Sequence, residues 1–197
     1  MSKQITNQDQ KGFTIIEVLI VLAIAALILL VVFLAIPGLQ RSQRNSARKS
    51  DVGRMTTGIA NYVANNNGSQ ITTQANCTTA MTDAGTTTQF KLISSACGNQ
   101  TGTAGTGSPT VVDAFAPTNA TPGIYFYTPF TTPAPNAQLN AAPTGSIAYL
   151  FPGYVCPATT GGSTIQVTTT GASSSSVAIA YANEGTSAFT WSCTNAG

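Results

Sequence analysis

Hydrophobic residues fill the chain from Phe13 to Ile36, with only Thr14 and Glu17 as polar exceptions. At 1.5 Å per residue, a helix of these 24 residues is roughly 36 Å long, enough to span a bilayer. The apolar core of a cleaved secretory signal peptide is shorter, about 7–15 residues. The pattern therefore predicts a membrane-spanning helix that stays in the protein.

Helical periodicity continues beyond this apolar run. Apolar residues with three- and four-residue spacing are Val52, Met55, Ile59, Tyr62 and Val63. Such spacing places the side chains on one face of a helix. The pattern stops in the Asn-rich stretch before Gly68, a composition that ends helices. We expect one long helix, with a transmembrane half at 13–36 and an amphipathic half at 37–66.

Three residues in the amphipathic half are unfavourable for a helix. Pro37 is expected to kink the helix where it leaves the apolar run. Gly53 and Gly58 are each expected to weaken it by about 1 kcal/mol relative to alanine. This half should therefore depend on neighbours along its length.

The region 67–197 is rich in Thr, Ser, Gly, Ala and Asn and predicts a β domain. Strand-like runs lie at Gly123–Phe130, Ser146–Gly153, Thr164–Thr170, Val177–Ala182 and Ala188–Cys193. In the fourth run Val, Ile and Tyr alternate with Ala, as in a strand with one packed face. Asn183–Ser187 predicts a hairpin loop, and Cys97–Pro109 predicts an irregular loop. The expected fold class is α+β, with the long helix packed on a small antiparallel sheet.

Four cysteines, Cys77, Cys97, Cys156 and Cys193, lie in the β domain. Their even number in a charge-poor, Thr/Ser-rich domain predicts two disulfides, with three connectivities open. Joining sequence neighbours favours Cys77–Cys97 and Cys156–Cys193, and buried free thiols are the alternative. Disulfides place this domain outside the cytoplasm, whereas the basic residues after the apolar run favour the opposite orientation. We give the cysteines more weight, because long domains translocate against a local charge bias.

Charge and composition argue against catalysis. Charged residues make up 7% of the chain and histidine is absent, which removes the commonest general base and metal ligand. Beyond Met55 the acidic residues are the scattered Asp83, Asp113 and Glu184. We therefore expect no enzyme activity, no cofactor and no metal site. Direct nucleic-acid binding is not expected either, because the β domain is nearly uncharged.

The start of the chain carries a family resemblance. A polar leader ends in Lys11-Gly12 and is followed by Phe13-Thr14-Ile15-Ile16-Glu17, which opens the apolar run. In this order the residues resemble the N-terminus of a type IV prepilin, over roughly residues 1–66. The resemblance implies that residues 1–12 are a leader peptide, which a prepilin peptidase removes by cutting between Gly12 and Phe13. It further implies N-methylation of Phe13, and neutralisation of the Phe13 amine by Glu17 of an adjoining subunit.

The position of Glu17 also has a physical interpretation. A charge inside a bilayer costs about 2–3 kcal/mol or more on insertion scales, so it usually has a partner. Cleavage after Gly12 creates an ammonium group four residues before Glu17, beside the positive end of the helix. Pairing between staggered subunits would then set their register. The alternative is a glutamate near the interface that extends toward lipid headgroups.

Arg41, Arg44 and Arg48 share one face of the expected helix. Pairing with acidic groups of neighbouring subunits is one interpretation. A solvated face, or contact with lipid phosphates, is the commoner role of such a row and is favoured here.

The resemblance implies a structural subunit of a type IV pilus that supports adhesion, surface motility or DNA uptake. Its implied partners are other pilin subunits, the prepilin peptidase, and the pilus assembly platform with its ATPase. The subunit would lie in the cytoplasmic (inner) membrane before assembly and in an extracellular pilus afterwards.

Two other functions stay open. A pseudopilin of a type II secretion or competence system is the alternative within the family. Major secretion pseudopilins hold calcium with acidic loops, and the lack of an acidic cluster here favours a pilin. A single-pass membrane-anchored binding domain that does not polymerise is the alternative from a different class.

Overall fold

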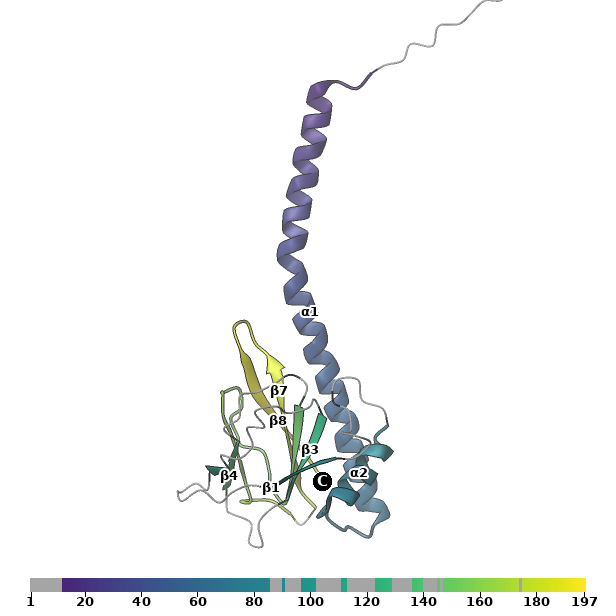
Figure 1. The fold of residues 1–197 in the computed structure, drawn as a ribbon, viewed down its shortest axis with the longest axis vertical. Coiled ribbons are helices and arrows are strands. Elements are labelled where there is room, and N and C mark those ends of the chain that lie inside the picture. The colour runs from purple at the N-terminus through teal and green to yellow at the C-terminus, as the bar shows by residue number, and fades with distance from the viewer. Residues whose placement is uncertain are drawn as a thin grey trace, which may run out of the picture. The chain divides into compact units, whose positions relative to one another are not determined.

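The computed structural model describes residues 12–85, 90, 97–101, 111–112, 123–128, 136–139, 145, 147–173 and 175–197 (Figure 1). The chain divides into two compact units, Met1–Gln40 and Arg41–Gly197. The first contains the apolar run, and the second contains the β domain with the helical residues that pack on it. The structure combines a long helix with a set of strands, which confirms the α+β fold class expected from the sequence.

Helix α1 runs from Ile15 to Asn65. Pro37 lies inside it and does not end it. In the first unit every side chain from Phe13 to Leu39 is exposed, including all the large apolar ones. Among the described helices, α1 is the one that is long and apolar enough to cross a membrane.

In the second unit α1 contributes its apolar stripe to the core. Val52, Met55, Ile59 and Tyr62 are buried, and Val63 packs against them partly buried. They form one cluster with sheet residues that include Ile124, Leu150, Val177 and Ile179. The stripe predicted from spacing is therefore the face that binds the sheet.

The larger sheet has five strands in the order β1-β3-β5-β7-β8. Their bounds are Gly98–Thr101, Gly123–Thr128, Ile147–Pro152, Val177–Glu184 and Phe189–Ala196. Strands β7 and β8 form the antiparallel hairpin predicted from the sequence, and they lie side by side in the yellow part of Figure 1. The β7 strand extends two residues beyond the predicted Ala182, and Gly185 closes the loop by donating to the carbonyl of Ala188.

This sheet is mixed, which corrects the expectation of a purely antiparallel one. Strand β1 pairs with β3 and β3 with β5 in parallel, whereas β5–β7 and β7–β8 are antiparallel. Residues 129–146 separate β3 from β5, which is too long for a tight hairpin and allows the chain to cross over and return in the same direction. The alternation of side chains along a strand does not reveal this direction of pairing.

A second sheet has the order β2-β4-β6, with bounds Val111–Val112, Asn136–Leu139 and Ile165–Thr168. Strand β2 is parallel to β4, and β4 is antiparallel to β6. Strands β1, β2 and β4 had no sequence signal: they span two to four residues each, and β1 lies in the stretch assigned to a loop. The strand run expected up to Phe130 is described only to Thr128.

Helix α2, Gln74–Asp83, was also missed. Its N-cap is Thr73, whose side chain accepts a hydrogen bond from the backbone N–H of Asn76. The helix buries Cys77, Ala80 and Met81. Four of its ten residues are threonine or asparagine, which have low helix propensity, so packing rather than composition determines this helix.

Gly58 is where α2 meets α1. A Cβ at Gly58 would clash with the carbonyl oxygen of Ala80 and with Ala84, whereas a Cβ at Gly53 would have nothing within 4 Å. From the sequence, Gly53 and Gly58 are expected to reduce the stability of the helix equally. The structure separates them: Gly53 is only a weak helix former, but Gly58 permits the close approach of two helices.

The two glycines make a matched pair for mutation. Gly53→Ala should raise the free energy of unfolding by about 0.5–1 kcal/mol, because alanine is the better helix former at an open site. Gly58→Ala should lower it by roughly 1–3 kcal/mol through overpacking against α2. Denaturant unfolding of the purified protein in detergent measures both. Equal stabilisation by the two variants would show that α2 does not pack against Gly58.

Candidate assembly site

Gly12 and Phe13 lie immediately before α1, and both are exposed. The Phe13 side chain is 85% exposed. The peptide bond between them is therefore outside helical hydrogen bonding and open to a peptidase. The structure places the predicted cleavage and methylation residues at the free end of the apolar helix.

Thr14 and Glu17 form a capping box at this helix end. The Thr14 hydroxyl oxygen accepts from the backbone N–H of Glu17 at 3.4 Å. In return, Glu17 Oε2 accepts from the backbone N–H of Thr14 at 3.4 Å and from its hydroxyl at 3.2 Å. The reciprocal bonds satisfy backbone donors that the first turn of a helix leaves unpaired. The signal for this capping box is present in the sequence as Thr-x-x-Glu, and hydrophobic periodicity alone does not reveal it.

The capping box leaves part of the Glu17 carboxylate available. Both of its hydrogen bonds reach Oε2, and among the described residues Oε1 has no hydrogen-bond partner. The helix N-terminus next to it carries a partial positive charge. Glu17 can therefore keep its capping hydrogen bonds with Thr14 and still bind a cation through Oε1.

A second polar site lies in the β domain, at Glu184. The guanidinium groups of Arg44 and Arg48 both bind the Glu184 carboxylate. Arg44 Nε lies 2.8 Å from Oε1 and its Nη2 2.6 Å from Oε2, and Arg48 Nη2 lies 2.6 Å from Oε1. The side chains of Arg48 and Glu184 are 4% and 14% exposed, and that of Arg44 is 45% exposed.

Further contacts hold Arg48 in this position. Its Nε donates to the Gly145 carbonyl at 2.7 Å, its Nη1 donates to Asn45 Oδ1 at 2.9 Å, and its guanidinium carbon lies 5.5 Å from the centre of the Phe189 ring. Asn45 also binds the main chain of Glu184, donating to its carbonyl and accepting from its N–H. A buried guanidinium is tolerable only with such a full set of acceptors.

These contacts correct the expectation for the arginine row. Arg44 and Arg48 pair within the chain with Glu184 rather than with another subunit or with lipid phosphates, whereas Arg41 forms no ion pair among the described residues. Hydrogen bonding from Arg44, and then from Arg48, lowers the pKa of Glu184 from 4.5 to about 2, while Glu184 raises the pKa of Arg44. No local sequence signal could have found this pair, because 140 positions separate Arg44 from Glu184.

The structure contains the two disulfides that sequence proximity favours. Cys77 of α2 is bonded to Cys97, and Cys156 is bonded to Cys193 of β8. The first fastens α2 beside the start of β1, where the Gln74 side chain also donates to the Cys97 carbonyl. The second fastens the last strand to the segment that follows β5.

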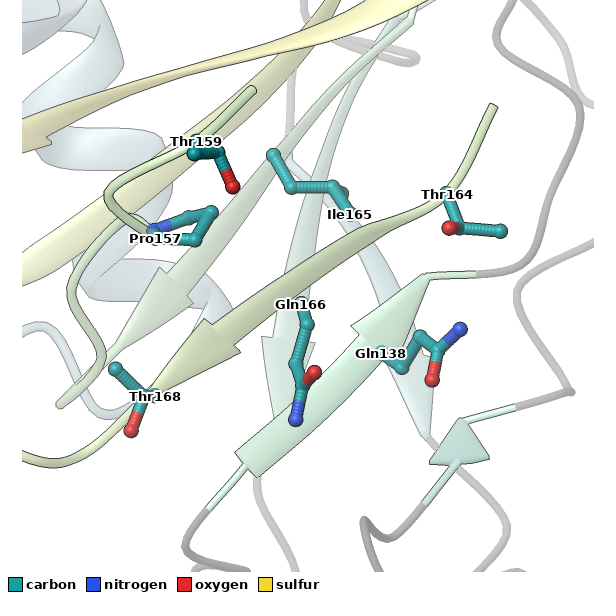
Figure 2. A pocket seen from close by; sticks show the side chains of 7 residues that line it. All are labelled: Gln138, Pro157, Thr159, Thr164, Ile165, Gln166 and Thr168. Atoms are coloured by element: carbon teal, nitrogen blue, oxygen red, sulfur yellow. The ribbon is translucent and has the colours of Figure 1, made fainter. Parts of the chain in front are cut away.

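A pocket of about 460 Å³ lies on the three-stranded sheet (Figure 2). Gln138 of β4 and Gln166 of β6 are direct neighbours across the antiparallel pair. The lining residues are Gln138, Pro157, Thr159, Thr164, Ile165, Gln166 and Thr168. Hydroxyl and amide groups in this lining offer hydrogen bonds, but none of them titrates near neutral pH, so the pocket holds no acid–base group.

Comparison with protein families matches residues 7–33 to the prokaryotic N-terminal methylation motif. The matched segment includes Gly12, Phe13, Thr14 and Glu17, the residues of the exposed helix end. No curated protein and no solved structure matches the chain. The motif thus bears on the first unit and its processing, and the β domain has to be interpreted from its own geometry.

Acid should weaken the β domain through Glu184. Because the pKa of Glu184 is lower in the folded state, its pairing contributes fully above pH 4.5 and is lost as the pH falls toward 2. Unfolding in detergent, followed across this range, should show that loss. Glu184→Gln should cost roughly 2–4 kcal/mol at neutral pH, because Arg48 stays buried without a counter-charge.

The same variant is the control for the pH effect. In Glu184→Gln the part of the pH dependence between 4.5 and 2 that comes from this group should disappear. An unchanged slope in the variant would mean that other carboxylates produce the acid sensitivity.

Proposed function

We propose that this chain is a structural subunit of a type IV pilus, since its methylation motif is the class III signal peptide of type IV pilins. The motif is typical of a pilin-like or pseudopilin precursor, and it implies processing by a prepilin peptidase and polymerisation. The observation that carries the proposal is the location of this motif, on the end of a helix with exposed apolar side chains.

The proposed sequence of events begins in the membrane. The apolar half of α1 anchors the precursor, and the peptidase cuts the exposed bond between Gly12 and Phe13. Hydrolysis releases the leader and leaves an amine on Phe13, which is then N-methylated and stays cationic. The two disulfides support an oxidising compartment for the β domain, and hence the non-cytoplasmic side of the membrane.

Assembly then replaces lipid by other copies around the helix. Apolar side chains gain little from this exchange, since lipid tails are as apolar as they are. The Glu17 carboxylate gains more, because Oε1 can accept from the Phe13 ammonium of an adjoining subunit in an environment of low dielectric constant. A subunit out of register would leave both charges unpaired, so the pair selects the register of the filament.

The small number of acidic residues, and the pairing of one of them with arginines, favour a pilin over a pseudopilin. Beyond Met55 the sequence has only three acids, and one of them, Glu184, is saturated by Arg44 and Arg48. A calcium site of the secretion type needs several free carboxylate oxygens. The proposed filament is extracellular, is assembled by a membrane platform and an ATPase, and serves adhesion, motility or DNA uptake.

Processing can be tested by intact mass. Filaments sheared from cells should contain a chain that begins at N-methylated Phe13, about 14 Da heavier than the unmethylated fragment by the addition of one CH₂. A membrane-retained chain that still carries residues 1–12 would instead indicate an anchored domain that does not polymerise.

The charge of Glu17 can be separated from its capping role. Glu17→Gln keeps an amide oxygen for the capping box but loses the charge, whereas Glu17→Ala loses both. Both variants should be processed and membrane-bound, and both should cut the yield of sheared filaments sharply, by roughly tenfold or more if about 1.4 kcal/mol per contact is lost. Normal yield from Glu17→Gln would show that Glu17 acts only as a helix cap.

A further inference from the structure

The second unit carries two charges of opposite sign that the described part of the fold does not use. Lys49 lies on α1 and Asp83 in the last turn of α2, and both are exposed. Among the described residues, neither takes part in a hydrogen bond or an ion pair. In a chain with only 7% charged residues, two such groups are notable.

The two charges lie on opposite sides of helix α1. Ala80 and Ala84, at the end of α2 that holds Asp83, contact α1 at Gly58. Lys49 precedes Gly58 by nine residues, which is two and a half helical turns at about 3.6 residues per turn. The Lys49 side chain therefore leaves α1 on the side away from α2.

The surface around Lys49 can accommodate another element. Gly53, Thr56 and Ala60 follow Lys49 at helical spacing on the same side of α1. All three are small, and a Cβ at Gly53 would meet nothing within 4 Å. The open space at Gly53 leaves room for the end of a second helix beside Lys49.

We propose that Asp83 of one copy pairs with Lys49 of the next copy along the filament. Complementary groups on opposite sides of a subunit make a head-to-tail contact, and such a contact repeats into an open helical polymer unless it closes into a ring. An isologous dimer would instead require a self-complementary patch on one side. The inference rests on the proposed polymerisation and assigns the β domain its own contact in it.

The geometry also fixes the axial offset. Asp83 belongs to the part of α2 that packs at the level of Gly58, nine residues below Lys49. Nine residues correspond to about 14 Å along a helix. Neighbouring copies should therefore be displaced along α1 by about this length, less what the flexible lysine side chain spans, with the α2 side of one copy facing the Lys49 side of the next.

Charge reversal tests the contact in cells that assemble filaments. Asp83→Lys and Lys49→Asp should each reduce sheared filament yield at least about fivefold, because like charges then face each other at every repeat. The double variant should restore the yield. Immunoblots of membranes should show equal amounts of subunit in all strains, since both positions are exposed and neither contacts the core.

Arg41 supplies the matched control. It is another basic residue on α1 with no partner among the described residues, so Arg41→Asp changes the net charge as Lys49→Asp does. Combined with Asp83→Lys, it should not restore filaments. Rescue by Arg41→Asp, or normal yield from either single reversal, overturns the proposed pair while leaving the pilus function intact.

Cysteines at the two positions provide a structural readout. Asp83→Cys with Lys49→Cys should give ladders of cross-linked subunits when filaments are treated with a bifunctional thiol reagent whose spacer is about as long as a lysine side chain, and single-cysteine variants should not. Filaments that contain the double variant without any ladder would contradict the contact. If the wild-type chain forms no filaments at all, the proposed function itself fails.

Discussion

The organisation of this protein depends on one constraint: the first unit exposes all of its large apolar side chains, from Phe13 to Leu39. Removing a side chain of this kind from water is worth about 1.5–3 kcal/mol, so surroundings of low polarity must cover the segment. The second unit differs, because its core is buried within the chain. The boundary at residue 40 thus separates a unit whose apolar surface must be covered by lipid or by other copies from a unit whose apolar core is buried within the chain.

Within the second unit the arginine–glutamate cluster gives the long helix a defined place on the sheet. Apolar contacts of the stripe tolerate small shifts, but the buried guanidinium of Arg48 does not, since removing any acceptor leaves a charge unpaired. Asn45 binds both the N–H and the carbonyl of Glu184, and so fastens the end of β7 by its main chain. A hairpin displaced by one residue would lose these bonds, so the cluster contributes specificity of docking more than net stability.

The sequence predicted the features that repeat along the chain. Helix α1, its buried stripe and strand β7 have residues in a regular period, and strands β3, β5, β6 and β8 lie in runs of strand-like composition. Helix α2 and strands β1, β2 and β4 are short and Thr- or Asn-rich, and tertiary contacts and a disulfide determine them. The parallel pairings and the Arg44–Glu184 bond depend on segments far apart in the chain. Composition carries no record of such contacts, so only the folded structure gives them.

At the candidate site the sequence identified the residues but not their state in a single subunit. Glu17 already has a partner there, because Thr14 shares a capping box with it. The carboxylate is therefore partly compensated while the precursor waits in the membrane, and the cost of placing it there is smaller than for an isolated charge. Before cleavage the Phe13 nitrogen is an uncharged amide bonded to Gly12, so no cation exists for the free oxygen of Glu17 to bind. Cleavage creates that cation on Phe13. On the proposed function, processing is therefore the step that turns a stable membrane anchor into a subunit whose Phe13 ammonium and Glu17 carboxylate can pair with neighbouring copies.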